Sequence, residues 1–498
     1  MRASSTLSLA VAVLTAFVLA SSPEPLLTLF AAAVLVAGIH LLWPAHDTPV
    51  LLLPFLLQWL SVAIKPFQSA ITGLPLDDFG VRGAQLSPAA WFGLLALLAL
   101  AIGMRTGAAT RRPRLFAREM RLDVAHLPQR LVIGAALLAL LAGHALDFAA
   151  GLAGPARQPV LMLANVKLAG LFVLTYWCVS RGRAFGLLIA VLGFEVISGM
   201  TGFFSEFKAI LLVAGLAAIA ARPRLGGGTL IAGGAAVAGV LLVLVFWSAI
   251  KPDYRAFMSD GKPDFAVEQP LGARLGFLAE AAGALDGEDL RQGFTALLGR
   301  LAYIDFLAHT LNHTPRFTPH TFGEQTAGAF RHLVPRLVWP GKPLAPHDTI
   351  VTARFTGLTF STLWASISIG YLGELYVDFG YCGALAAMLL IGFAIGSIYR
   401  ILMAYRGLPT LVNAAVATTA IIPFVYFERA LLKLVGGSLT LFIAALLIQR
   451  VAIPRVLTWL VAQRARAARR RRPPFREVLA HARTPAPPPG SPPPHAPG

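Results

Sequence analysis

The sequence predicts an all-α protein, a polytopic bundle of about twelve transmembrane helices with one large segment outside the membrane. Three observations predict this fold: the composition, a series of apolar runs of membrane-spanning length, and an uneven placement of Lys and Arg. Hydrophobic residues make up 56% of the 498 residues, and charged residues only 13%. Soluble domains are less apolar and carry roughly twice that share of charge. Lipid is therefore the expected surrounding of most of the chain.

Apolar runs of about 20 residues mark the predicted spans, because a helix of that length crosses the hydrocarbon core of a bilayer. We predict twelve spans, at 7–20, 26–43, 50–64, 90–104, 131–149, 159–178, 184–198, 205–221, 229–249, 381–399, 409–425 and 431–449. The first has a second interpretation, since residues 19–22 resemble a signal-peptide cleavage site. We favour an uncleaved anchor, because the run 26–43 follows at once as its hairpin partner.

Lys and Arg set the predicted orientation, because they concentrate in the short cytoplasmic loops of membrane proteins. With the N-terminus inside, most basic residues fall in the cytoplasmic loops and after residue 449. The short outside loops carry only Lys65, Arg82, Arg157 and Arg429. Both termini are then cytoplasmic. The net charge of +18 reflects this topology, so we expect no nucleic-acid partner.

This topology divides the chain into four parts. Residues 1–249 form an N-terminal bundle of about nine spans, and residues 250–380 form a large periplasmic loop. Residues 381–449 supply three further spans. Residues 450–498 form a basic and then Pro-rich cytoplasmic tail, which we expect to touch anionic lipid and to be disordered.

The external segment 250–380 is too long to be a simple connection. Apolar residues at helical spacing predict amphipathic helices at 271–285 and 290–311, lying on the bilayer or over the bundle. Asp286 is a predicted N-cap, with Asp289 close behind.

A Pro-rich stretch follows at 331–343, where the prolines exclude a long helix and stiffen the backbone. Its cations Arg331, Arg336 and Lys342 would then be held in fixed positions. Farther along, Glu374 and Asp378 are four residues apart, so on a helix they share one face.

These motifs resemble those of the O-antigen and exopolysaccharide repeat-unit polymerases of the Wzy type. The resemblance rests on Arg-x₄-Arg-x₂-Trp-Pro-x-Lys-Pro at 331–343, on Ser-x-Gly-Tyr-Leu-Gly-Glu-Leu-Tyr-x-Asp-Phe-Gly-x-x-Gly at 368–383, and on Trp247-x₃-Lys251-x₂-Tyr254-Arg255. The arrangement of a dozen or so helices with one dominant external loop before the last spans is also similar. The resemblance implies a glycosyltransferase-C-like fold in the bacterial inner membrane, with its active face outside the cytoplasm.

Such polymerases join oligosaccharide units carried on undecaprenyl diphosphate. A sugar hydroxyl attacks the anomeric carbon and lipid diphosphate leaves, which requires cations at the diphosphate and a base for the hydroxyl. The implied partners are the lipid-linked oligosaccharide, membrane lipid and a chain-length-regulating co-polymerase. We expect no cofactor and no metal, because Arg and Lys can carry the charge. A ligase, a transporter or flippase for lipid-linked sugars, and a non-catalytic assembly subunit are the alternatives, although a transporter should show repeated halves.

The resemblance and the placement of charge give the candidate site residues. The catalytic candidates are Glu374, Asp378, Arg336 and His332, and the substrate-binding candidates are Arg331, Lys342, Lys251, Arg255, Tyr254, Glu195 and Lys208. Charges at the outer ends of spans are costly and therefore functional candidates. Structural interpretations stand beside these roles. The cations could bind lipid headgroups, Glu195 could pair with Lys208, and the two later carboxylates could pair with the external arginines.

Overall fold

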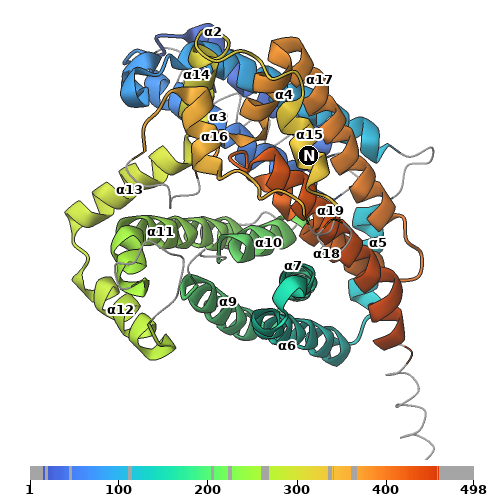
Figure 1. The fold of residues 1–498 in the computed structure, drawn as a ribbon. Helices are drawn as coiled ribbons and strands as arrows, with labels where there is room; N and C mark the ends of the chain where they lie inside the picture. The colour runs from blue at the N-terminus through green and yellow to red at the C-terminus, as the bar shows by residue number, and fades with distance from the viewer. Residues whose placement is uncertain are drawn as a thin grey trace, which may run out of the picture. The chain divides into compact units, whose positions relative to one another are not determined.

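The computed structural model describes residues 15–16, 21–43, 48–109, 115–202, 207–221, 227–259, 269–334, 339, 341–360, 367–456 and 458. Every regular element within these ranges is a helix (Figure 1). Residues Met1–Leu446 form one compact unit and Leu447–Gly498 a second. The all-α prediction is therefore confirmed for the part of the chain that is described.

Seven of the described helices are long and apolar enough to cross a membrane. They are α2 (Pro25–Leu42), α4 (Leu86–Ala108), α6 (Gln129–Leu152), the consecutive α7 and α8 (Arg157–Ala164 and Val166–Arg181), α11 (Gly227–Met258), α17 (Gly370–Met403) and α19 (Leu431–Leu447), which continues to Val456. Three further apolar helices are shorter: α9 (Phe185–Met200), α10 (Phe207–Ala220) and α18 (Thr410–Ile421), extended by the 3-10 turn η4 (Ile422–Val425).

Ten of the twelve predicted spans coincide with these helices. The predicted span 50–64 is also helical, in α3 (Leu52–Thr72), but Gln58, Ser61 and Lys65 lower its hydropathy and it is not among the seven. The predicted span 7–20 lies outside the described residues except for 15 and 16. The number of helices that cross the membrane, and their direction, stay predictions.

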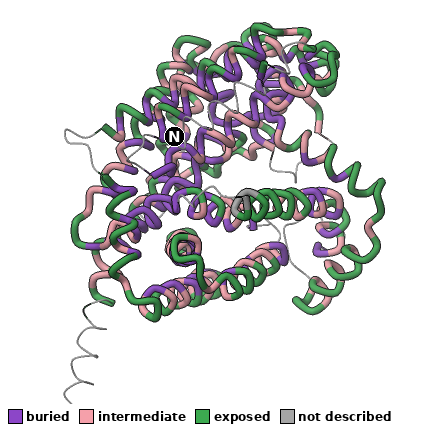
Figure 2. The backbone as a smooth tube through the Cα atoms, turned by 180° about the vertical axis from the view of Figure 1, so that it is seen from behind, coloured by how far each residue is buried: buried purple, intermediate pink, exposed green. Residues whose placement is uncertain are grey.

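Helices α4 and α17 make the most extensive helix contact in the first unit. Gly103 and Gly107 on α4 lie against α17, and Gly392 and Gly396 on α17 lie against α4. A Cβ atom on any of the four would lie 2.1–2.2 Å from a backbone oxygen of the opposite helix. Small residues four apart allow such close backbone approach in membrane helices. Figure 2 shows many buried residues in the bundle, whereas residues 231–239 of α11 are exposed.

A buried ion pair fixes part of the external segment to the bundle. Lys65 Nζ on α3 lies 2.5 Å from Asp305 Oδ2 on α14 (Ile304–His313), and both side chains are less than 10% exposed. The same ammonium donates to the carbonyl of Phe79, and Asp305 accepts from the backbone N–H of Val81. Removing either partner would leave an uncompensated buried charge, which is strongly destabilising.

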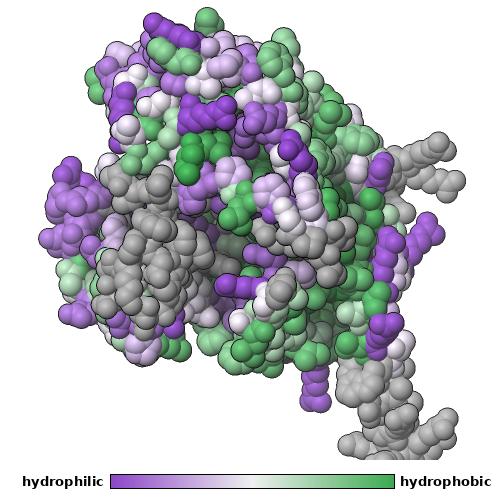
Figure 3. All heavy atoms as spheres, viewed as in Figure 1, coloured by the Kyte–Doolittle hydropathy of each residue, from purple (hydrophilic) through white to green (hydrophobic). Residues whose placement is uncertain are grey.

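Residues 250–380 contain more helices than the sequence predicted. Besides α14 they include α12 (Leu271–Ala284), α13 (Gly287–Leu301), α15 (Glu324–Arg331) and α16 (Asp348–Thr356). The predicted cap is confirmed: Asp286 accepts from the N–H of Asp289, and the two form a capping box. In Figure 3 hydrophilic residues gather beside α12 and α13, whereas apolar residues cover much of the side near α17.

The prediction of one continuous helix over 290–311 is wrong. The chain breaks at Ala302 and Tyr303, between α13 and α14. Both residues are buried, and the Tyr303 ring packs edge-on against Phe427. A long-range contact therefore decides the break, and the local apolar spacing carries no sign of it.

Both predicted ends of the external segment fall inside helices. Helix α11 continues through residues 249 and 250 without interruption. Helix α17 starts at Gly370 and has a sharp break at Gly380, where φ is 65° and ψ is −167°. Only glycine adopts this backbone conformation readily. The stretch that carries Glu374 and Asp378 is thus a separate helical piece in front of the predicted span 381–399.

Candidate functional site

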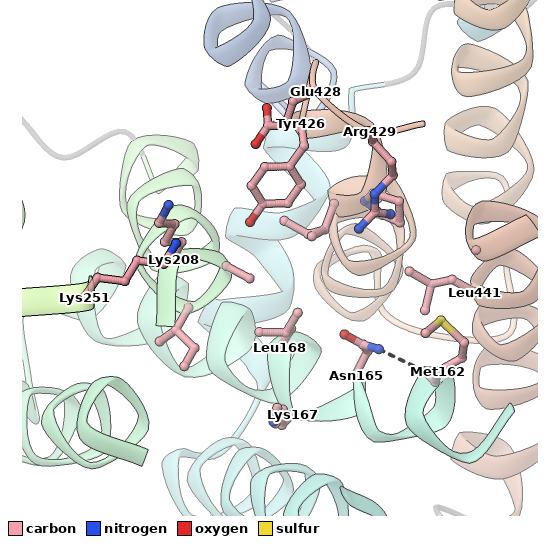
Figure 4. Close-up of a pocket in the computed structure, with 15 residues that line it drawn as sticks. Met162, Asn165, Lys167, Leu168, Lys208, Lys251, Tyr426, Glu428, Arg429 and Leu441 are labelled. Carbon is pink, nitrogen blue, oxygen red and sulfur yellow. Dashed lines mark hydrogen bonds between the residues drawn. The ribbon is translucent and has the colours of Figure 1, made fainter. Parts of the chain in front are cut away.

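A cavity of about 420 Å³ lies where several apolar helices end (Figure 4). Its walls come from α7, α8, the start of α10, the end of α11, the segment 422–429 and α19. The lining includes seven polar side chains: Asn165, Lys167, Lys208, Lys251, Tyr426, Glu428 and Arg429. Segments more than 250 residues apart in sequence therefore form one polar pocket against apolar helices.

Three cations dominate this cavity. Lys208 and Lys251 enter from one side, and Arg429 lies on the other side with Tyr426 (Figure 4). All three side chains are partly buried. Among the described residues, none of the three makes a side-chain hydrogen bond or a salt bridge. Three partly buried cations thus face one exposed carboxylate, Glu428, among the described lining residues. Partly buried charge that is not fully balanced is unfavourable, so the cavity is suited to bind an anion.

Arg429 is held beside an aromatic ring. Its guanidinium carbon lies 5.9 Å from the ring centroid of Tyr426, within cation–π distance. Burial lowers the pKa of Arg429, whereas Tyr426 and Glu428 raise it. Because the ordinary pKa of arginine exceeds 12, the group stays charged at neutral pH.

Two more arginines extend the positive charge toward α13. Arg255 follows Lys251 by one turn on α11, and Arg300 is on α13, which packs along α11. The positive charges of both arginines repel the ammonium group of Lys251. Within the described part of the lining, Glu428 is the only carboxylate, and it is exposed.

Both predicted catalytic carboxylates of α17 are buried and have structural partners. Glu374 accepts from the backbone N–H of Leu431, the first residue of α19, at 3.0 Å. Asp378 is completely buried and accepts four hydrogen bonds from α15 and the residues before it. The donors are the Thr321 hydroxyl, the Gln325 N–H, and the N–H and hydroxyl of Thr326. The suggested pairing of these two carboxylates with external arginines is not formed among the described residues.

Glu195 does not pair with Lys208, so that part of the sequence interpretation is wrong. Its carboxylate instead lies 2.7 Å from Nε2 of His144 on α6. One turn later on α6, Asp147 pairs with Lys167 of α8 at 2.5 Å. These contacts join α6 to α9 and to α8, and they leave Lys208 directed at the cavity. A direct role for Glu195 in binding substrate stays a prediction.

The Pro-rich stretch is described only in part, and its described candidates Arg331, His332 and Lys342 are not among the residues that line the cavity. Arg336 lies outside the described residues. Arg331 is exposed at the end of α15, and the ring Nδ1 of His332 lies 2.8 Å from the Gly328 carbonyl. Lys342 donates to the carbonyls of His332 and Val334, both at 2.8 Å. Such a contact satisfies carbonyls at a helix C-terminus, so Lys342 has a structural partner.

Tyr254 is buried and belongs to an aromatic cluster. Its ring lies 5.5 Å from Trp247 and 5.4 Å from Phe277, measured between centroids. The cluster packs α12 against α11 directly behind the predicted cations Lys251 and Arg255. Tyr254 therefore supports the position of these cations and does not line the cavity itself.

Tyr426 and Glu428 were not predicted as site residues, and Arg429 was predicted only to lie in a short outside loop. All three lie in a five-residue connection between two apolar runs, at a predicted outer end. An acidic and a basic residue side by side in so short a connection are a detectable signal, since charge at a membrane boundary is costly. Nothing in the sequence, however, places this connection next to Lys208 and Lys251.

No family model, curated protein or solved structure matches this chain.

Proposed function

We propose that this protein is a membrane glycosyltransferase that polymerises oligosaccharide units linked to undecaprenyl diphosphate, at the outer face of a bacterial inner membrane. The observation that carries the proposal is the cavity in which Lys208, Lys251 and Arg429 converge, with Glu428 as the one carboxylate among the described lining residues. The nature of the substrate rests on the resemblance of the sequence motifs to the Wzy-type polymerases.

The cavity suits a diphosphate on electrostatic grounds. A leaving diphosphate gains negative charge as the glycosidic C–O bond breaks, and fixed cations stabilise that charge. The planar fork of Arg429 matches two phosphate oxygens, and the lysines supply point charges from the opposite wall. No reorganisation is needed, because all three cations already face the same space.

The surroundings of the cavity suit a lipid-linked substrate. The first half of α11 is exposed over an apolar stretch that includes Ile231, Val237 and Leu242. Apolar helix surface of this kind belongs in lipid. An isoprenoid chain bound beside these helices would stay in the bilayer while its diphosphate reached the cavity.

The predicted topology places the cavity on the extracytoplasmic side. Its lining residues come from the ends of spans 159–178, 205–221, 229–249, 409–425 and 431–449 that the Lys and Arg distribution assigns to the outside. Lipid-linked repeat units are polymerised at this surface in the family that the motifs resemble.

A gene deletion with sizing of the surface polysaccharide tests this function. We expect the deletion strain to keep single repeat units and to lose long chains. Full-length glycan left on the lipid would instead indicate a ligase. Single units that accumulate on the inner leaflet would indicate a flippase.

Complementation of the deletion strain tests the cavity. We expect Lys251→Met and Arg429→Met each to lower polymer formation by about 100-fold, the effect of removing one charge-stabilising contact from a transition state. Arg291→Met is the matched control, because Arg291 is exposed and pairs with the exposed Glu288 on the surface of α13. Wild-type polymer with both cavity variants, at normal protein levels, would overturn the proposed site.

A further inference from the structure

The connection that carries Tyr426, Glu428 and Arg429 is anchored at both of its ends, on either side of these lining residues in the sequence. Before it, the side-chain amide of Gln58 on α3 donates to the carbonyl of Phe424 at 2.5 Å. The hydroxyl of Tyr371 on α17 donates to the same amide at 2.6 Å and holds it in place. After the cavity, Glu374 accepts from the N–H of Leu431. Two elements of the bundle thus fix both ends of this connection.

The middle of the connection is anchored by Phe427. This side chain is 1% exposed and packs against Tyr303 and Tyr371, with ring centroids 5.7 and 5.9 Å away. A Cβ atom on Gly370 would lie 2.5 Å from the Phe427 carbonyl oxygen, so α17 approaches the connection closely. With Phe427 directed into the protein, its neighbours Tyr426 and Glu428 line the cavity.

The two glutamates near this connection have opposite environments. Glu374 is 6% exposed and is not among the residues that line the cavity. Its oxygen is occupied by the first backbone N–H of α19, in the manner of a cap that satisfies a helix N-terminus. Glu428 lines the cavity, is exposed, and is the residue directly before Arg429. A carboxylate that accepts a proton from a substrate must be within reach of it, and only Glu428 meets this condition among the described lining residues.

We propose that Glu428 is the proton acceptor of the reaction in this cavity, and that Glu374 is a positioning residue that holds Glu428 and Arg429 in place. This inference rests on the proposed function. The acceptor sugar hydroxyl gives its proton to the Glu428 carboxylate while its oxygen forms a bond to the anomeric carbon. The bond from that carbon to the diphosphate oxygen breaks, and lipid diphosphate leaves with the electron pair. The charge balance is kept, because one carboxylate is neutralised and one phosphate oxygen becomes anionic.

The test uses the full-length purified protein and lipid-linked single units extracted from the deletion strain, with release of undecaprenyl diphosphate as the readout. We expect Glu428→Gln to lower kcat by about 100-fold or more, the usual contribution of a general base, with KM changed only a few-fold. Glu428→Asp should recover part of the rate, because it restores a carboxylate.

Glu374 should respond differently to the same change. Glu374→Gln keeps an acceptor oxygen for the Leu431 N–H, so this variant should retain most of the turnover. Glu374→Met removes the acceptor and should lower kcat and raise KM, because both Glu428 and Arg429 lose their fixed positions. An inactive Glu374→Gln at wild-type levels of folded protein, or a fully active Glu428→Gln, would overturn the assignment.

The cation variants separate this inference from the proposed function. If Lys251→Met and Arg429→Met are inactive while Glu428→Gln turns over normally, only the role of Glu428 is wrong. If all three variants turn over normally, the cavity is not the reaction site and the proposed function fails with it.

Discussion

At the scale of single residues, the sequence identifies chemical groups but not their partners. Glu374 and Asp378 stand out as two carboxylates on one helix face in a chain with few charges. Their hydrogen-bond donors lie 52 to 57 residues away in sequence, so no local pattern reveals that each satisfies the N-terminal end of another helix. Lys208 and Lys251 were predicted, and the structure brings them into one cavity. Glu428 was missed, because its importance depends on segments that are remote in sequence.

Asp378 gives a stability prediction at this scale. Asp378→Ala removes the acceptor for two backbone N–H groups and two hydroxyls, all in a buried setting. We expect a loss of at least about 2 kcal/mol of unfolding free energy, because buried donors without acceptors carry their full desolvation cost. Thermal unfolding in detergent would measure this loss.

The matched control is Asp286→Ala, which removes the exposed N-cap acceptor for the Asp289 N–H on α13 and should cost about 1 kcal/mol. An equal or smaller effect at Asp378 would contradict a structural role for this carboxylate and would return it to the list of catalytic candidates.

At the scale of elements, apolar run length predicts helices well and tertiary contacts decide the rest. The predicted span 26–43 is α2 within one residue at each end, and 431–449 begins at the first residue of α19. The break at Ala302 and the break at Gly380 were not predicted. The first depends on where the Tyr303 ring packs, and a lone glycine in an apolar helix does not by itself specify a break.

The crossing of α4 and α17 gives a prediction for this scale. Gly103→Ala and Gly392→Ala each place a methyl group against a backbone oxygen of the opposite helix, which cannot move aside as a side chain can. We expect a loss of about 1–3 kcal/mol for each variant, as for other overpacked cores. Unfolding temperature and the yield of folded protein in detergent would report it.

Gly134→Ala on α6 is the matched control, since a Cβ atom there meets nothing within 4 Å. It should be neutral or stabilising by up to about 1 kcal/mol, because alanine favours a helix over glycine. If Gly392→Ala is as stable as Gly134→Ala, the close approach of the two helices is not what holds this crossing.

At the scale of the whole molecule, the proposed function requires that the cavity face the extracytoplasmic side of the membrane. The distribution of Lys and Arg assigns five span ends to the outside, and the structure brings those same five ends to one cavity. Apolar runs alone do not predict which end of a span faces the cytoplasm, so the predicted sidedness rests on the Lys and Arg distribution.

The most direct measurement is the accessibility of residue 428 to a membrane-impermeant maleimide. Cys178 and Cys382 would first be replaced by alanine, and then Glu428→Cys would be labelled in spheroplasts. Arg118→Cys, exposed on α5 (Phe116–His126) in the predicted cytoplasmic loop, is the control. We expect residue 428 to react without permeabilisation and residue 118 only after it. Labelling of residue 428 only after permeabilisation would place the cavity in the cytoplasm and contradict the account.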